Sequence, residues 1–361
     1  MPIRIAVYAI CKNEAAFARR WMESMAEADA VYVLDTGSED GTPELLRELG
    51  ARVACEKIDP WRFDVARNRS LELVPEDVDV CVCTDLDEVF RPGWRAALES
   101  AWRPEVEQYA YRYVWSFTPE GREGHVFWID NVHCREGFRW THPVHEVLTW
   151  QGPGRPVRAE VPGMCLDHHP DPNKSRGQYL PLLELSVAED PEDDRNLHYL
   201  GREYYFYGMW EKCIQTLQRH LALPRAVWRD ERCASLRYIA KSAAHVRPNE
   251  AESWFLRAAA EAPWLREPWL DYARWLYEKK DWAGLLWATE RCRSIRTRPR
   301  TYITEAESWG SAPWDLGALA CWHLGLYEKA AALGAHAAAL APEDARLRRN
   351  LEYYRSALAG D

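Results

Sequence analysis

Residues 78–88 read VDVCVCTDLDE, so a short apolar run ends in the three carboxylates of Asp85, Asp87 and Glu88. In an open α/β sheet, ligands bind outside the carboxyl ends of the strands. Mg²⁺ and Mn²⁺ prefer one or two carboxylates together with substrate phosphate oxygens. The stretch therefore predicts a strand with a metal-assisted site at its end. A solvated turn is the alternative, but Asp85 and Asp87 flank apolar Leu86 and point the same way in an extended chain.

The composition is that of a soluble globular protein. The chain has 361 residues, 47% hydrophobic and 28% charged, which predicts about two domains. Its net charge of −10 disfavours a nucleic-acid partner, because such binding depends on Lys and Arg. We expect a cytoplasmic protein without a membrane span, since no apolar run is long enough and no signal pattern is found. The ten scattered cysteines are expected to be free, mostly buried thiols.

The first half alternates short apolar runs with helical patterns, which indicates a parallel sheet with crossover helices. Strands are expected at residues 3–10, 30–34, 51–55 and 78–84, with helices at 15–26, 43–49 and 64–74. Aromatic and β-branched segments at 109–117, 125–134 and 144–150 follow, and we expect antiparallel strands that complete a mixed sheet.

After about residue 172 the pattern becomes helical and repetitive. The turns between paired helices are predicted at Gly208, Val246, Lys280 and Gly325, and an apolar residue follows five positions after each, at Cys213, Ala251, Leu285 and Ala330. This pattern resembles a tetratricopeptide array of four degenerate units with an insertion near residues 296–311. Tryptophans recur through this half; they either pack helix against helix or form an aromatic surface for a peptide or glycan.

Three further polar stretches follow predicted strands and are expected at the same sheet edge as Asp85. They are CKNE at 11–14, DTGSEDGT at 35–42 and WRFDVARN at 61–68. Glu14 alone is explained as an acid in the first turn of a helix, and residues 40–42 as a turn and helix cap. Together, with Arg67 as a phosphate contact, they suit a nucleoside diphosphate. The sequence has no glycine-rich phosphate loop, which disfavours an ATPase or dehydrogenase.

These motifs resemble those of glycosyltransferase family 2. The resemblance rests on Lys12-Asn13-Glu14, on residues 35–38 and 40–42, on Ala66-Arg67-Asn68 and on Asp85-Leu86-Asp87. It implies a GT-A catalytic domain, a Rossmann-like mixed α/β sheet, over residues 1–170. An all-α tetratricopeptide-like domain would occupy residues 171–361. The combination is similar to repeat-bearing members of the family that include peptide S-glycosyltransferases.

The resemblance also implies roles for individual residues. The donor site, for the uracil, ribose and diphosphate of a UDP-sugar, would consist of Asn13, Glu14, Asp35, Thr36, Gly37, Asp40, Arg67 and Asp85. The cofactor would be Mn²⁺ or Mg²⁺. Asp85 would contact the ribose or the metal, and Asp87 would bind the metal. His168 would be a third ligand, in preference to His169.

Family 2 enzymes invert the anomeric centre by single displacement, so a general base is needed unless the acceptor is already a thiolate. The usual acidic base motif is not obvious in this sequence. Its best substitute is WTHPVHE at residues 140–146, from which we select Glu146, with His145 and His142 as alternates.

The sequence thus predicts a metal-dependent inverting glycosyltransferase that moves a hexose from a UDP-sugar to a peptide or protein, to a Cys or Ser side chain. Two alternatives are a transferase extending a saccharide or lipid-linked glycan, and a peptide-binding repeat scaffold with weak catalysis. A nucleotidyltransferase is disfavoured because no triphosphate-binding loop is found. The repeats would recruit the acceptor and offer a surface through which two copies of the chain could associate as a homodimer.

Overall fold

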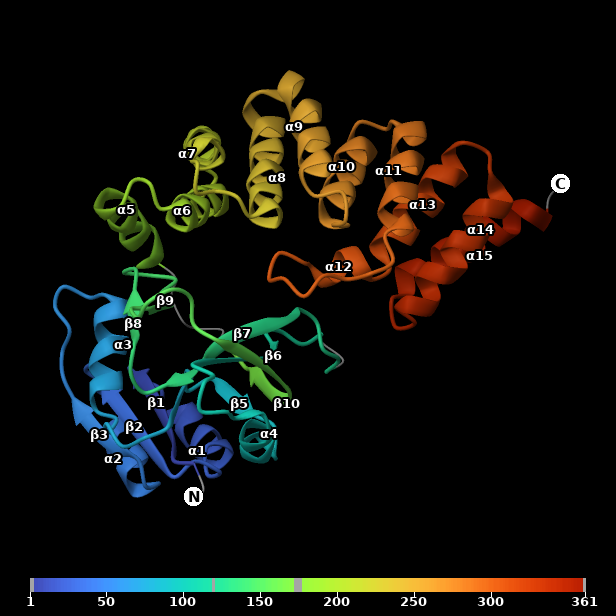
Figure 1. Cartoon of the computed structure of the whole chain (residues 1–361). Helices are drawn as coiled ribbons and strands as arrows, with labels where there is room; N and C mark the ends of the chain where they lie inside the picture. Colours follow the sequence, from blue (N-terminus) through green and yellow to red (C-terminus); the bar gives the residue numbers. More distant parts are fainter. Residues whose placement is uncertain (1–2, 119–120, 172–176, 360–361) are drawn as a thin grey trace. The chain divides into compact units, whose positions relative to one another are not determined.

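The computed structural model describes residues 3–118, 121–171 and 177–359. The chain forms two compact units, Met1–Ser186 and Val187–Asp361. The predicted domain limit after residue 170 lies before helix α5 (Tyr179–Glu189), which begins in the first unit and ends in the second. We describe each unit separately (Figure 1).

The first unit is built on a mixed sheet of eight strands in the order β3-β2-β1-β4-β7-β6-β10-β5. The strands are β1 (Ile5–Cys11), β2 (Ala30–Asp35), β3 (Arg52–Cys55), β4 (Val80–Cys83), β5 (Glu88–Phe90), β6 (Gln108–Val114), β7 (Val126–Cys134) and β10 (Arg158–His168). Strands β1 to β4 are mutually parallel where they pair, which confirms the predicted parallel half and the mixed sheet.

The other half of the sheet differs from the prediction in two respects. The segment predicted at 144–150 forms strand β9 (Val147–Trp150), but β9 pairs with β8 (Phe138–Thr141) in a separate two-stranded sheet and does not complete the mixed sheet. Strand β7 is antiparallel to both β4 and β6, as expected, but β6 and β10 are parallel, so the expectation of antiparallel strands throughout is wrong here. Strand β10 then pairs antiparallel with the short β5, in a register that places Glu88 opposite His168. This long-range pairing brings the end of the acidic stretch to a histidine eighty positions later.

Successive side chains of each strand point to opposite faces of the sheet, and both faces carry apolar side chains that other elements cover. Ile5 and Val7 pack in a core with helices α1 (Ala15–Ser24), α2 (Thr42–Glu48) and α4 (Trp94–Ala101). Tyr8 faces the opposite side, where helix α3 (Phe63–Glu72) and a separate ribbon of β8 (Phe138–Thr141) and β9 (Val147–Trp150) cover it. Figure 1 shows this layering around the blue and green strands. The ribbon and α3 therefore lie on the same face, beside the end of β4.

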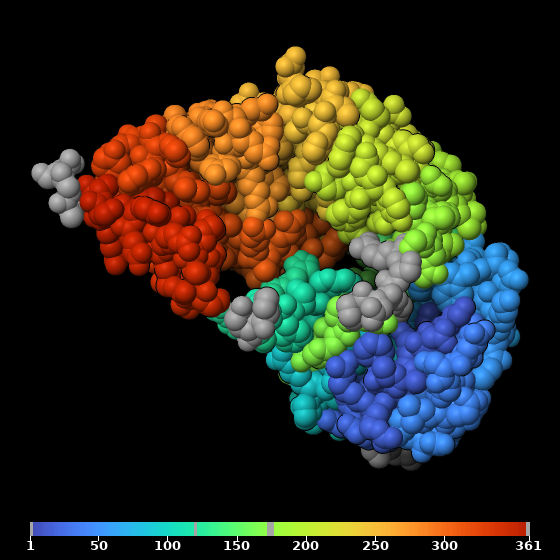
Figure 2. Space-filling view, turned by 180° about the vertical axis from the view of Figure 1, so that it is seen from behind, coloured from blue at the N-terminus to red at the C-terminus, as the bar shows by residue number. Residues whose placement is uncertain are grey.

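The second unit is an array of helices in which successive helices pack against each other. After α5 they are α6 (Asp194–Phe206), α7 (Trp210–Ala222), α8 (Arg229–Val246), α9 (Pro248–Glu261), α10 (Glu267–Glu278), α11 (Trp282–Ser294), α12 (Ala306–Trp309), α13 (Ala312–His323), α14 (Tyr327–Leu340) and α15 (Ala345–Ala359). Figure 2 shows them following one another as a continuous surface, from yellow-green α6 to red α15.

The helix pairs confirm the predicted repeat. Gly208, Lys280 and Gly325 separate α6 from α7, α10 from α11 and α13 from α14, whereas Val246 is the last residue of α8 and directly precedes the turn to α9. Gly208 and Gly325 have φ values of 68° and 73°, the left-handed conformation that ends a helix most readily at glycine. The four residues five positions later, Cys213, Ala251, Leu285 and Ala330, are all fully buried. The second unit is thus a tetratricopeptide-like helical array.

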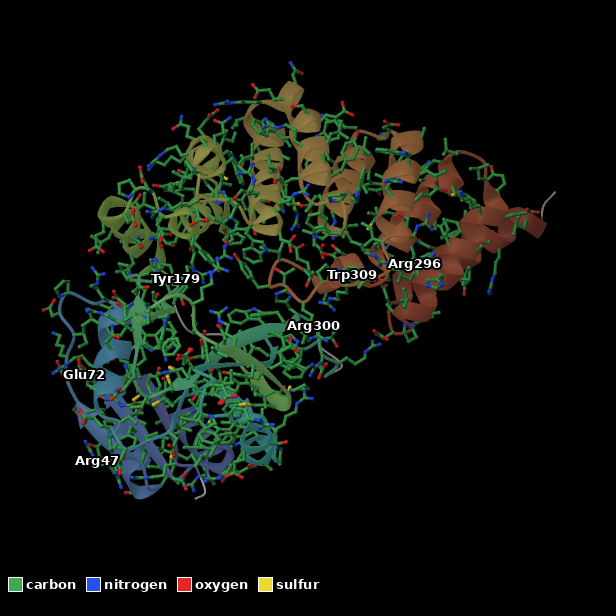
Figure 3. The ribbon with its side chains drawn as sticks, viewed as in Figure 1. Arg47, Glu72, Tyr179, Arg296, Arg300 and Trp309 are labelled. Atoms are coloured by element: carbon green, nitrogen blue, oxygen red, sulfur yellow. The ribbon has the colours of Figure 1, made fainter. Side chains whose placement is uncertain are left out.

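The predicted insertion packs onto the array itself. Its helix α12 carries Trp309, labelled in Figure 3, whose indole donates to Glu267 on α10 at 3.0 Å. The backbone amide of Glu305 donates to the same carboxylate oxygen at 2.9 Å. Tyr302 donates to Glu231 on α8 at 2.6 Å. The insertion therefore closes over α8 and α10 through buried polar contacts.

Other sequence predictions have mixed outcomes. All ten cysteines are described and free, and most are buried, although Cys55 is exposed. Among the tryptophans of the array, Trp254 and Trp269 are buried as packing residues, whereas Trp264 and Trp287 are partly exposed. Among the described residues, no helix is both long enough and apolar enough to cross a bilayer.

A buried ion pair in the array should make its stability depend on acid. Arg237 donates to Asp271 at 2.6 Å, and Lys241 lies 3.2 Å from the same carboxylate oxygen. Burial alone would raise the pKa of Asp271, but the two cations outweigh it and lower this pKa to about 2. Because the folded pKa lies below the unfolded value of about 3.9, the ion pair stabilises fully above about pH 5, and this contribution is lost as pH falls towards 2.

We predict that Asp271→Asn lowers the free energy of unfolding by about 3 kcal/mol at pH 7. The substitution removes the buried charge that Arg237 and Lys241 share, and leaves Arg237 only its pair with the more exposed Glu305. The substitution should also weaken the loss of stability between pH 5 and 2. Urea unfolding at several pH values measures both effects. The matched control is Glu290→Gln, which removes an exposed pair with Lys329 and should change little. Equal unfolding free energies for the two variants would contradict the prediction.

Candidate functional site

The ends of the parallel strands bring two predicted donor-site loops together. The last residue of β1, Cys11, is paired with the last residue of β2, Asp35. Beyond these ends, the backbone amide of Asn13 donates to Ser38 Oγ at 2.8 Å, and Asn13 Oδ1 accepts from the amide of Glu39 at 2.8 Å. Asn13 itself has φ of 56°, which Asn tolerates better than most residues. The predicted proximity of these loops is confirmed.

Within these loops, the Asp35 side chain accepts hydrogen bonds from backbone amides of the turn that follows it. It is 2% exposed, and its Oδ1 accepts from the amides of Gly37 at 3.0 Å and Ser38 at 2.9 Å. Thr36 donates its hydroxyl to the carbonyl of Cys11 at 3.0 Å. These side chains shape the edge of the sheet, and Gly37 supplies the positive φ of 112° that the turn requires.

Asp40 and Glu14 both lie at helix starts. Asp40 agrees with the interpretation of residues 40–42 as a turn and helix cap, whereas Glu14 precedes α1 and is not an acid in its first turn. Asp40 Oδ2 accepts from the amide of Ala15 at the start of α1, and its Oδ1 accepts from the amide of Thr42 at the start of α2. Glu14 is buried, and its amide donates to Thr42 Oγ1 at 2.8 Å. One loop thus orients the first turns of both helices.

A buried guanidinium lies among the carboxylates at this edge of the sheet. Arg67 on α3 donates to Asp85 Oδ1 at 2.6 Å and to Glu146 Oε1 at 3.0 Å. Its side chain is 9% exposed and lies over the ring of Trp140, 5.6 Å from the ring centre. Burial lowers the pKa of Arg67, but the neighbouring carboxylates outweigh this and hold it well above its ordinary value. Arg67 therefore joins the acidic stretch to the predicted base.

Asp87 and His168 form the second pair at this edge. His168 Nε2 lies 3.5 Å from Asp87 Oδ2, and both side chains are about nine-tenths buried. The other ring nitrogen, Nδ1, contacts the carbonyl of Trp115 at 3.0 Å, so it carries the proton and donates. The ring also stacks on the Trp115 indole with centroids 4.4 Å apart. This arrangement turns Nε2 towards Asp87, as in metal-bound histidines. Burial lowers the pKa of His168, but the Asp87 carboxylate and the Trp115 carbonyl outweigh burial and raise it.

The two aspartates do not point the same way, and the extended-chain expectation is wrong. Leu86 and Asp87 form a tight turn between β4 and β5. Asp85 consequently faces Arg67 and is partly exposed, whereas Asp87 is buried beside His168. Among the described residues, Asp85, Asp87 and His168 do not bring three ligand atoms within 4.8 Å of one another. A cation could be held here by Asp87 and His168, with its other ligands from outside the chain. His169 stacks instead on Phe117, with centroids 5.4 Å apart.

The family resemblance implies no role for Glu88, and the structure shows what this residue contacts. Its carboxylate accepts from the Tyr113 hydroxyl at 2.6 Å and from the amide of Asp85 at 2.9 Å. Burial, together with the nearby charge of Asp85, raises the pKa of Glu88 to about 8. Glu88 thereby fixes the turn that carries Asp85 and Asp87. The position of Glu88 beside Asp85 and Asp87 in the sequence already indicated a residue of this site. No sequence motif indicated that Tyr113 and Trp115 would contact it.

The predicted base region is a strained turn between β8 and β9. His142 and His145 have φ values of 77° and 53°, which is uncommon for residues other than glycine. The ring of His145 contacts Tyr179 edge to face at 5.6 Å; Figure 3 labels Tyr179 at the start of α5. His142 Nδ1 lies 3.3 Å from the hydroxyl of the preceding Thr141. Of the three candidate bases, Glu146 is the one that the structure brings to Arg67.

Comparisons with known proteins concern the helical repeat. No family model matches this chain. Similar solved structures include yeast Tom70, at 14% identity over 52% of this chain and 37% of Tom70, with a TM-score of 0.39. MamA matches at 15% identity over 46% of this chain and 89% of MamA, with a TM-score of 0.37. A thermophilic tetratricopeptide protein of Thermus thermophilus matches at 18% identity over 50% and 89%, with a TM-score of 0.35.

The role of Arg67 can be tested independently of any activity. We predict that Arg67→Gln lowers the free energy of unfolding by about 3 kcal/mol at neutral pH, because Asp85 and Glu146 lose their buried counter-charge. The matched control is Arg69→Gln, two residues later on the same helix, where the exposed pairs with Glu56 and Glu72 contribute little. Chemical denaturation of both variants compares them. If Arg69→Gln destabilises as much as Arg67→Gln, the central role of Arg67 is wrong.

Proposed function

We propose that the first unit is a metal-dependent inverting glycosyltransferase domain that binds a nucleoside diphosphate sugar. The observation that carries this proposal is the Asp87 and His168 pair at the carboxyl edge of the sheet, 3.5 Å apart, with the His168 ring oriented by Trp115. A carboxylate and an imidazole nitrogen at this position suit a divalent cation shared with substrate phosphates. The mixed sheet, whose β4 ends directly before Asp85 and Asp87, also supports it.

Asp87 and His168 would hold the Mn²⁺ or Mg²⁺, which supplies Lewis-acid stabilisation of a departing diphosphate. Around them, the chain's own residues set the shape and charge of the donor site. The Asn13 and Asp35 loops form one wall, and they would border the base and ribose. Arg67 is already neutralised by Asp85 and Glu146, so its proposed part is to orient Asp85 towards the donor.

The proposed donor is a UDP-hexose, and the proposed acceptor is a Cys or Ser side chain of a peptide or protein. Glu146 is the first choice for the general base, with His145 and His142 as alternates. Glu146 Oε1 is engaged by Arg67, so proton abstraction would use Oε2. The helical array would recruit the acceptor, since solenoids present extended binding surfaces.

A second function is binding of a peptide by the helical array, with weak or no catalysis in the sheet unit. The array itself favours it: its helix pairs extend from α6 to α15, with partly exposed aromatic side chains such as Trp264 and Trp287. The structural comparisons are compatible with this function. Its test is peptide binding by the full chain without release of nucleotide from any sugar donor.

For the transferase, we predict that the full chain releases UDP from a UDP-hexose only when Mn²⁺ or Mg²⁺ is present. Asp87→Ala should lower this turnover on the order of 100-fold or more, because a metal ligand is lost. A coupled assay for UDP measures the rate, and mass spectrometry of a peptide mixture identifies the acceptor. The control Asp77→Ala removes an exposed aspartate paired with Arg4 and should keep full turnover.

Three results would change the proposal. Full turnover by Asp87→Ala would remove the metal role from this residue. If UDP-, GDP- and dTDP-hexoses all stay intact while peptides bind, the scaffold function replaces the transferase. Release of pyrophosphate in place of UDP would indicate a nucleotidyltransferase.

A further inference from the structure

Three potential metal ligands converge in the second unit, far along the chain from the acidic stretch. Asp194 lies in the first turn of α6, His220 near the end of α7 and Glu231 in the first turn of α8. Their ligand atoms all lie within 4.8 Å of one another, the one such group of three among the described residues. His220 and Glu231 are buried, with 0% and 4% exposure, and Asp194 is half-buried. Three successive helices therefore meet at one polar point.

The imidazole of His220 is hydrogen-bonded through its Nδ1 atom. Ser235 Oγ lies 2.9 Å from His220 Nδ1 and 2.8 Å from His198 Nδ1. A hydroxyl has one proton and can donate to only one of the two rings, so the other ring must donate to it. We assign that donation to His220 Nδ1, which leaves Nε2 with a lone pair.

The other nitrogen, His220 Nε2, is buried and has no hydrogen-bond partner among the described residues. It faces Glu231 Oε1 at 3.6 Å, which is longer than a hydrogen bond. Two ligands of one tetrahedral Zn²⁺ lie roughly 3.3 Å apart, because Zn–N and Zn–O bonds are about 2.0–2.2 Å. The separation therefore suits a cation between the two atoms, and a small movement of the half-buried Asp194 would complete three ligands.

Glu231 is oriented in the manner of a metal-bound carboxylate. The Tyr302 hydroxyl donates to its Oε2 at 2.6 Å, which leaves Oε1 for His220 and the enclosed space between them. Hydrogen bonds of this kind commonly orient metal ligands from outside. The buried guanidinium of Arg195 also lies near Glu231 and offsets part of the negative charge.

We propose that Asp194, His220 and Glu231 bind a divalent transition-metal cation that links helices α6, α7 and α8. One imidazole with two carboxylates favours Zn²⁺ over Mg²⁺ or Ca²⁺, which prefer oxygen ligands alone. Asp194 is the ligand of the three that is partly exposed to solvent. The bound cation joins the first helix pair of the array to the next, so its effect is to stabilise this end of the array. The inference does not depend on the proposed sugar transfer.

The test uses Zn²⁺ alone and the full chain carrying Asp87→Ala and Cys55→Ser, which remove the other proposed site and the exposed thiol. After chelator treatment, calorimetric titration should show one Zn²⁺ site, and saturating Zn²⁺ should raise the melting temperature. Adding Asp194→Asn should weaken this site at least tenfold and abolish the thermal shift. The matched control is Asp193→Asn, at the adjacent helix cap, where Asn caps as well as Asp and the Zn²⁺ affinity should be unchanged.

Two results would overturn the proposal. One is the absence of both Zn²⁺ binding and a thermal shift in the parent chain. The other is unchanged Zn²⁺ affinity in the Asp194→Asn variant, with helicity by circular dichroism equal to that of the parent. His220→Gln, compared with His245→Gln at the Trp210 stack, provides a second and independent pair.

Discussion

The buried guanidinium of Arg67 is the interaction on which the polar edge of the sheet depends. Asp85, Asp87, Glu88 and Glu146 would otherwise bring like charges together in a poorly hydrated region, at a large cost. Arg67 neutralises Asp85 and Glu146 directly, and the raised pKa of Glu88 removes part of the remaining charge. Asp87 is left facing His168. At this edge of the sheet, Asp85 and Glu146 are paired with the Arg67 guanidinium, whereas Asp87 faces only the imidazole of His168.

The carboxylates of Asp85, Asp87 and Glu88 are close together in the sequence, yet each has a different environment. A tight turn at Leu86 and Asp87 rotates successive side chains to different sides, and Glu88 fixes that turn through the amide of Asp85. The cation site proposed for sugar transfer is correspondingly open, with two ligands from the chain. The site proposed at Asp194, His220 and Glu231 is more enclosed, and its three ligands come from three helices. Open coordination suits a substrate phosphate, whereas enclosed coordination suits a structural cation.

The helical unit uses buried polar contacts in the same way as the sheet unit. Arg237 with Asp271, and Glu267 with Glu305 and Trp309, lie where the insertion packs onto α8 and α10. Tyr302 of the insertion also orients Glu231. Residues 296–311 interrupt the repeat in sequence, yet in the structure they complete the contacts of helices that precede them. An irregular segment in a repeat array therefore contributes to its packing and to its polar cluster.

The sequence by itself determined the elements that depend on local periodicity. Strands β1, β2 and β4 with their polar ends, and the helix turns at Gly208 and Gly325, follow from alternation and turn residues over a few positions. Only the tertiary structure decided which distant groups meet. Strand β10 pairs parallel with β6 and antiparallel with β5, and Arg67 pairs with Asp85. These contacts join segments that are 18 to 80 residues apart in the sequence. Local hydrophobic patterns carry no information about such pairings, because strand partners and buried counter-charges are selected by packing across the whole unit.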